Sequence, residues 1–165
     1  MTEQNFWQLI DNVKSAAGTD IDSRPAALEK HLSLLQPAEI QSFQQRYESL
    51  LLASNSWSLI GAAYLMNGGC SDDGFKYFRD WLISEGEQTF KQAAADPDSL
   101  ASLAPQEPFE LELFGYAALH AYEALGEGEL ERDFSVEFAV TAGEEWDESE
   151  LPALLPKLAA KYLEN

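Results

Sequence analysis

The sequence predicts a single all-α domain over residues 1–165, with roughly seven to nine helices and one short extended segment near the C-terminus. Apolar residues recur every three or four positions through most of the chain, which is the spacing of one helix face. Glycine and proline residues interrupt these runs, as expected at helix ends. Only one stretch alternates like a strand, and no second strand is available to pair with it.

Three helices are expected before residue 55. Thr2 can cap the first, which ends near Gly18. Ser23 can cap the second, with Pro25 in its first turn, and Pro37 opens the third. The residues expected to face inward share helical spacing. They are Phe6, Trp7, Ile10 and Val13 in the first helix, Leu28, His31, Leu32 and Leu35 in the second, and Ile40, Phe43, Tyr47, Leu50 and Leu51 in the third.

A pair of helices around a glycine turn is the most distinctive part of the chain. Residues 58–66 form an apolar helical run that Gly68 and Gly69 end, because glycine enters the left-handed region without a Cβ penalty. Ser71 or Asp72 then caps a second helix, where adjacent carboxylates suit the positive end of the helix dipole. The apolar residues that follow at helical spacing are Phe75, Phe78 and Leu82, with Tyr77 and Trp81 on a neighbouring stripe.

Shorter elements are expected from residue 87 to residue 125. A short helix reaches Asp96, a helical turn covers residues 98–103, and prolines set a loop at 104–108. Residues 110–125 read as a helix that Gly126 and Gly128 stop. The inward positions of these elements follow the same spacing. They are Phe90 and Ala93 or Ala94 in the short helix, and Leu113, Tyr116, Ala117 and His120 in the last one.

The apolar period changes from helical to alternating at residues 133–140, which predicts a strand. Such a strand would pair with a dimer mate, or the segment would lie extended over the helices. Asp147 is placed to start the final helix, and Pro156 implies a break or a restart in it. The residues expected to bury this last element are Leu151, Leu154, Leu155, Leu158 and Tyr162.

Several motifs resemble the DUF4240 family. The longest covers residues 67–75, Asn-Gly-Gly-Cys-Ser-Asp-Asp-Gly-Phe, and others are 77–79, 81–83, 96–98, 114–116 and 145–147. Trp57, residues 61–64, and the N-terminal pairs 6–7 and 10–11 add to the resemblance, which covers most of the chain. Residues 126–143 match least well. The resemblance implies a domain of unknown function, with no activity or catalytic residue to carry over.

The net charge of −19 is the strongest compositional signal. It argues against nucleic acid and anionic membranes as partners, because phosphate binding needs clustered lysine and arginine. It favours solubility, and it would also attract a basic protein. No basic region followed by an apolar one marks a secretory signal. The chain has one cysteine and therefore no internal disulfide, so we expect a cytoplasmic location.

The turn at residues 67–79 holds one candidate site, formed by Asn67, Cys70, Asp72, Asp73 and Arg79. Cys70 precedes a helix N-terminus, which can lower a thiol pKa, but the adjacent carboxylates oppose this and no motif links a histidine to it. The alternative is a small packing cysteine. The carboxylate and amide oxygens suit Mg²⁺ or Ca²⁺, yet helix capping explains them equally. We expect no metal and no cofactor.

A second candidate is an acidic surface near the C-terminus. Residues 123–150 contain eleven carboxylates and one basic residue, Arg132, with the aromatics Phe134, Phe138 and Trp146 interleaved. Carboxylates that steer and aromatics that anchor would suit a basic protein partner. The alternative is a solvated face whose aromatics point into the core. The residues expected to contact a partner are Glu131, Asp133, Glu144, Glu145, Trp146 and Glu148.

Two functions follow from these candidates. The first is a non-enzymatic protein-binding module, inhibitor- or immunity-like, that uses the acidic surface. The alternative is an enzyme, or a protein that binds a small molecule or metal, with its site at the Asn67–Arg79 turn. No recognised catalytic or phosphate-binding motif is present in the sequence, which favours the first.

Overall fold

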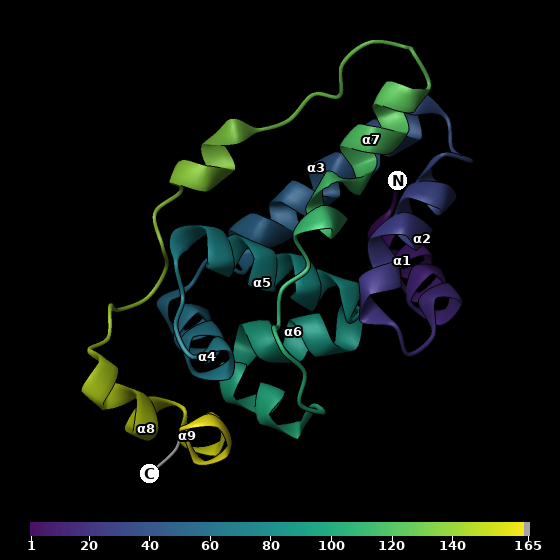
Figure 1. Cartoon of the computed structure of the whole chain (residues 1–165). Helices are drawn as coiled ribbons and strands as arrows, with labels where there is room; N and C mark the ends of the chain where they lie inside the picture. Colours follow the sequence, from purple (N-terminus) through teal and green to yellow (C-terminus); the bar gives the residue numbers. More distant parts are fainter. Residues whose placement is uncertain (164–165) are drawn as a thin grey trace.

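Residues 1–163 are described by the computed structural model, and they fold into α-helices joined by short 3-10 helices (Figure 1). The α-helices are α1 (Glu3–Ala17), α2 (Arg24–Leu32), α3 (Pro37–Ala53), α4 (Trp57–Asn67), α5 (Asp72–Ser84), α6 (Glu87–Ala95), α7 (Ala117–Ala124), α8 (Leu151–Leu154) and α9 (Pro156–Tyr162). The 3-10 helices are η1 (Ile21–Ser23), η2 (Pro97–Ser102), η3 (Glu112–Tyr116), η4 (Phe134–Phe138) and η5 (Glu148–Glu150). The prediction of an all-α domain is confirmed.

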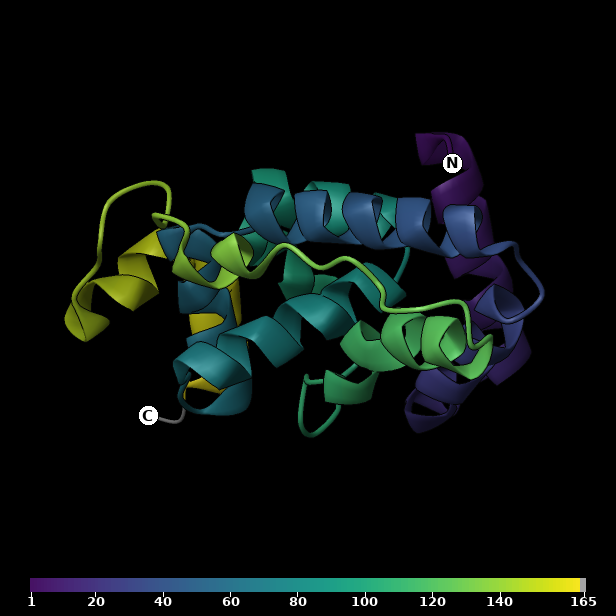
Figure 2. The same cartoon turned by 90° about the horizontal axis from the view of Figure 1, so that it is seen from above.

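The helices gather into two ends that α3 and α5 connect. At one end α2 packs against α1 and α7, and at the other α9 packs against α4, α8 and η2 (Figure 1). The segment from residue 126 to residue 147 runs from the first end to the second, alongside α3 (Figure 2). This segment therefore lies over the space between α3, α5 and η3.

The core is continuous across α1, α3 and α5, as their apolar stripes predicted. Phe6 stacks on Phe43 with ring centroids 4.8 Å apart, and Trp81 meets Phe109 edge to face at 5.1 Å. Aromatic pairs of this kind add to the stability gained from burial. Most predicted inward residues of the first five helices are buried, whereas His31, Leu35, Leu50 and Tyr77 lie at the edge of the core.

Four helix-end predictions can be compared with the structure. The hydroxyls of Thr2 and Ser71 cap α1 and α5, and Pro156 restarts the chain as α9 after α8 ends. Ser23 precedes α2, but its hydroxyl donates to the carbonyl oxygens of Ala17 and Asp20, so the prediction that it caps α2 was wrong. The Ser23 hydroxyl is used by carbonyl oxygens in and before the η1 turn, and it accepts no hydrogen bond from an amide of α2.

The predicted inward face of residues 110–125 is confirmed at Ala117 and was wrong at its other three positions. Leu113 is 62% exposed, and Tyr116 and His120 are exposed too. The buried residues are Leu111, Phe114, Ala117, Ala118 and Ala121. The cause is η3, because a 3-10 helix turns every three residues and so changes which side of the following α-helix faces the core. Leu154 was likewise expected inside and is exposed.

The predicted strand at residues 133–140 is absent, and no strand occurs within residues 1–163. Residues Phe134–Phe138 form η4, which the carboxylate of Asp133 caps by accepting from the amide of Ser135 at 3.0 Å. This local cap favours a turn over an extended strand. The second expectation, an extended segment over the helices, is what residues on either side of η4 form, with a single β-bridge between Ser56 and Ala142.

A tertiary cap joins η2 to α9. The two carboxylate oxygens of Asp98 accept hydrogen bonds from the amides of Lys157 and Leu158, at 3.1 and 2.9 Å. These amides lie in the first turn of α9, where no partner exists within the helix. Asp98 therefore does for α9 what a local capping residue does elsewhere.

We expect Asp98→Ala to lower the free energy of unfolding by about 1–2 kcal/mol, because two amides of α9 lose their acceptor. Urea denaturation followed by circular dichroism measures the change. The matched control is Asp22→Ala, an exposed carboxylate without a side-chain hydrogen bond, which should change stability by less than about 0.5 kcal/mol. Equal losses for the two variants would contradict the assigned cap.

Candidate functional site

Asn67 lies at the end of α4 and holds the chain at Phe109. Its side-chain oxygen accepts from the amide of Phe109 at 2.8 Å, and its side-chain nitrogen donates to the carbonyl oxygen of Phe109 at 3.3 Å. Gly68 follows with φ of 70°, in the left-handed region that glycine adopts without a Cβ penalty. The amide of Asn67 is therefore already occupied by a backbone partner.

Ser71 is the residue that caps α5, since its hydroxyl accepts from the amide of Gly74 at 3.0 Å. Asp72 and Asp73 lie exposed in the first turn of α5, where the helix dipole favours negative charge. Within residues 1–163, no three histidine, cysteine or carboxylate side chains gather in a way that could hold a metal ion.

Cys70 is half-buried beside the core. Burial, together with the charges of Glu110 and Asp72, raises the pKa of its thiol to about 11, against the opposing charge of Arg79. The thiol donates weakly to the carbonyl oxygen of Ser71 at 3.5 Å. A thiol with this pKa is protonated near neutral pH and is a poor nucleophile.

The two histidines hold other positions. His31 contacts the carbonyl oxygen of Ala27 through Nδ1 at 2.7 Å, within α2. His120 lies on α7, with Nδ1 at 3.9 Å from Glu29 and its ring stacked on Tyr116. Both partners lie outside the 67–79 turn, so these contacts give Cys70 no base.

Arg79 is the one turn candidate that is buried, at 8% exposure. Its Nη1 donates to the carbonyl oxygen of Leu51 at 2.6 Å, and its guanidinium lies 4.3 Å from the centre of the Phe75 ring. Burial lowers its pKa, while the charge of Asp80 acts in the opposite direction. No carboxylate within residues 1–163 forms an ion pair with it.

A polar cluster that sequence reasoning missed lies next to Arg79. The carboxylate of Asp80 is fully buried, and it accepts from the Tyr47 hydroxyl at 2.5 Å and from Lys76 Nζ at 2.8 and 3.0 Å. Burial raises the pKa of Asp80, whereas Lys76 and Tyr47 act to lower it. A buried carboxylate needs such partners, since an unpaired one costs several kcal/mol.

Gly115 makes room for this cluster. A Cβ added there would overlap Lys76 Nζ and lie 2.8 Å from Asp80 Oδ1. The 3-10 helix η3 therefore approaches α5 so closely that only glycine leaves the ion pair in place. The next residue, Tyr116, presents its ring to Lys76 Nζ at 5.6 Å from the ring centre.

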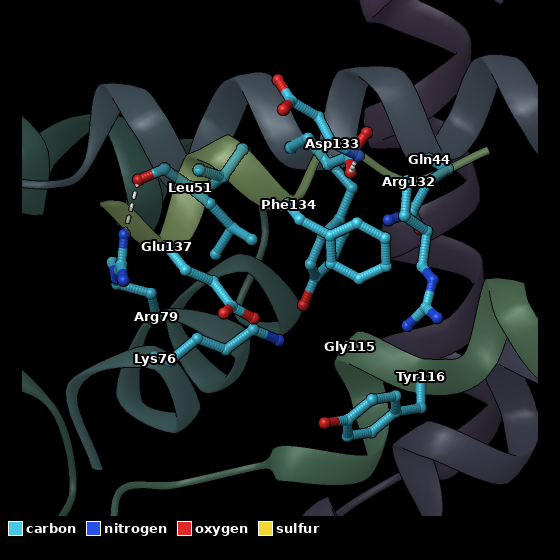
Figure 3. A pocket seen from close by; sticks show the side chains of 13 residues that line it. Gln44, Leu51, Lys76, Arg79, Gly115, Tyr116, Arg132, Asp133, Phe134 and Glu137 are labelled. Carbon is cyan, nitrogen blue, oxygen red and sulfur yellow. Dashed lines mark hydrogen bonds between the residues drawn. The ribbon is translucent and has the colours of Figure 1, made fainter. Parts of the chain in front are cut away.

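A cavity of about 110 Å³ lies next to the cluster (Figure 3). Four parts of the chain form its walls, namely α3, α5, η3 and the segment that contains η4. The side chains that line it carry both signs of charge. They are Gln44, Tyr47, Glu48 and Leu51 from α3, Lys76 and Arg79 from α5, Tyr116 with Gly115 from η3, and Arg132, Asp133, Phe134, Val136 and Glu137 from the segment. The cavity brings Arg79 and Asp133 together, one from each predicted site.

One sequence signal could have located the Lys76–Asp80 pair, because residues four apart on a helix are neighbours. Tyr47 was expected in the core for its ring, and its hydroxyl gave no separate signal. Arg132 is the one basic residue of the acidic stretch, and it lies at the cavity with its guanidinium 4.8 Å from the centre of the Phe134 ring.

The acidic stretch is held to the helices mainly through its backbone. Gln41 bonds both the amide and the carbonyl oxygen of Glu131 at 2.8 Å, and Glu48 accepts from the amide of Asp133 at 2.6 Å. Further along, the amide of Trp57 donates to the carbonyl oxygen of Ala142 at 2.9 Å. The side chains of the stretch are therefore left to face solvent over much of its length.

The predicted contact residues differ in what their side chains do. The indole of Trp146 donates to the carbonyl oxygen of Trp57 at 2.5 Å and packs edge to face on Tyr64, so it fastens the stretch to α4. A hydrogen bond to Glu148 raises the pKa of Tyr64. Glu144 and Glu145 are exposed. The structure thus separates residues that fasten the stretch to the helices from residues whose side chains are exposed.

Exposed apolar side chains accompany these carboxylates. Phe134 is 59% exposed, Phe138 81% and Val140 94%, while Val136 between them is buried. The alternative in which the aromatics of the stretch point into the core therefore holds for Trp146 and not for Phe134 or Phe138.

Comparison with known proteins places most of the chain in a described family. A family model described as "Protein of unknown function (DUF4240)" matches residues 1–124. No curated protein and no solved structure was found to match the chain. Within the described residues, none of the helices has the length and apolar character required to cross a membrane.

We expect Gly115→Ala to lower the free energy of unfolding by about 1–3 kcal/mol, because the added methyl group overlaps the buried ion pair. A double-mutant cycle with Lys76→Met, measured by urea denaturation, tests the cause. The two losses should be less than additive, since Lys76→Met removes the ammonium group that the new methyl group would overlap. Additive losses would place the effect elsewhere.

Cys70 should react slowly with iodoacetamide in the folded protein between pH 7 and 9, because its pKa of about 11 leaves little thiolate. The folded pKa exceeds the ordinary thiol value of about 8.5, so this thiol favours the native state at lower pH and that contribution falls as pH rises through 11. The rate in the native protein and in urea is compared by mass spectrometry. Equal rates would contradict the raised pKa.

Proposed function

We propose that this chain, which belongs to the DUF4240 family, is a non-enzymatic module that binds a basic protein through its acidic C-terminal stretch. The observation that carries the proposal is the exposure of Phe138 and Val140 on a stretch whose carboxylates form no ion pair within residues 1–163. Apolar side chains this exposed commonly mark interaction surfaces when they cluster with others. Their position on a stretch with eleven carboxylates and one base indicates the sign of the partner.

The way the stretch is attached supports the proposal. Backbone hydrogen bonds to α3 and α4, together with the indole of Trp146, hold it in place. A surface fixed before binding loses less conformational freedom when a partner docks. Carboxylates around exposed aromatics would speed encounter with a basic partner, and the aromatics would anchor it.

Inhibitor- or immunity-like action is the form of binding that we propose, with the partner's basic surface covered by the acidic stretch. A cytoplasmic location is proposed with it, on the basis of a single free cysteine. The alternative function at the Asn67–Arg79 turn has less support, because Asn67 and Ser71 already serve backbone groups and the pKa of Cys70 is high.

Capture experiments test the proposal. The tagged protein should retain a stoichiometric basic protein from host lysate at low salt and lose it at high salt, because steering by exposed charges is screened. Replacing Phe138 and Val140 by serine should weaken the purified complex at least about tenfold, which is about 1.4 kcal/mol. Isothermal titration calorimetry measures this change.

The charge contribution needs a matched control. Reversal of Glu131, Glu144 and Glu145 to lysine should also weaken the complex, whereas the same reversal at Asp22, Glu39 and Glu107 changes net charge equally at exposed positions away from the stretch. Equal effects of the two triple variants would mean that net charge alone acts. An unchanged complex in the first triple variant and in the serine variant would overturn the proposal.

A further inference from the structure

We propose that the cavity between α3, α5, η3 and the η4 segment binds a small zwitterion of the amino-acid type (Figure 3). The carboxylate of the ligand pairs with Arg79 and Lys76, and its ammonium group with Glu137 and Glu48. The site is distinct from the exposed Phe138 and Val140, which carry the protein-binding proposal and are not among the residues that line the cavity.

Arg79 is the first reason. It is a buried cation that lines the cavity and forms no ion pair within the described part of the chain. Its Nη1 and Nε donate to the carbonyl oxygens of Leu51 and Phe75, at 2.6 and 3.4 Å, and no hydrogen bond of Nη2 is found in residues 1–163. A buried charge without a counter-charge is costly, so a carboxylate in the cavity would supply what the fold leaves out.

Lys76 is the second reason. Its ammonium group reaches the cavity and bonds both oxygens of one carboxylate, that of Asp80. An ammonium group has three donors, so one remains for a ligand oxygen. The buried pair with Asp80 and the close approach of Gly115 fix the position of Nζ before any ligand arrives.

The carboxylates of Glu48 and Glu137, which also line the cavity, define the rest of the ligand. Glu137 is exposed at the cavity and forms no ion pair within residues 1–163, and Glu48 is nearly buried with its Oε2 on the amide of Asp133. A simple anion would meet both of these charges and the field of a protein with net charge −19. A zwitterion is neutral overall, and its two charges can pair with the cations and the carboxylates that line the cavity.

The size of the cavity limits the ligand. The cavity is small, at about 110 Å³. The proposed ligand is therefore in the range of the smallest amino acids, such as glycine, alanine and serine.

Titration of the ¹⁵N-labelled full chain with glycine, alanine or serine, followed by NMR, tests the proposal. At least one should give saturable shifts at the amides of residues 76–79 and 132–137. Acetate and methylammonium, which each carry one of the two charges, should bind at least about tenfold more weakly. Partner capture uses a different readout, so failure here leaves the protein-binding proposal standing.

Variants assign the two charges. Glu137→Gln, at an exposed position, and Arg79→Lys should each raise the dissociation constant of the zwitterion at least about tenfold. Glu144→Gln, which lies outside the cavity, should leave it unchanged. The proposal is overturned if none of the three amino acids gives a saturable shift, if acetate binds as tightly as they do, or if Glu137→Gln has no effect.

Discussion

The carboxylate of Asp80 is the constraint on which the middle of the structure depends. It lies at the centre of α5 with no exposure, and its two partners come from α3 and from the preceding turn of α5. Losing either partner would leave a buried charge poorly compensated. The packing of α3 on α5 and the close approach of η3 at Gly115 are therefore tied to one polar group.

A second level of organisation comes from tertiary capping and backbone bonding. Asp98 caps α9 from η2, and Asn67 holds the chain at Phe109. Side chains of distant segments therefore satisfy backbone groups at a helix end and in a loop. The acidic stretch continues this pattern, since Gln41, Glu48 and Trp57 satisfy its backbone. A segment held in this way does not need to bury its own side chains, which explains why Phe138 and Val140 are exposed.

Sequence periodicity predicted the first five helices well because it reports which face of one element is apolar. Phe6, Phe43 and Phe78 are buried as their spacing predicted, and Ser71 caps α5. Periodicity failed at η3 and η4, where the chain forms 3-10 turns. A 3-10 helix has three residues per turn, so its inward positions are spaced differently from those of an α-helix or a strand. Periodicity could not reveal which side chains of different helices meet, so the Tyr47–Asp80–Lys76 cluster was missed.

The family match includes some of the residues that line the cavity and not the others. Three walls of the cavity, which carry Tyr47, Lys76, Arg79 and Gly115, lie within residues 1–124, whereas the wall formed by the η4 segment lies beyond them. The matched part supplies the buried cation and the fixed ammonium group. The unmatched part supplies Glu137 and the exposed aromatics. The proposed anion recognition in the cavity therefore rests on residues within the family match, while the proposed selection of a zwitterion and the proposed contact with a basic partner rest on residues beyond it.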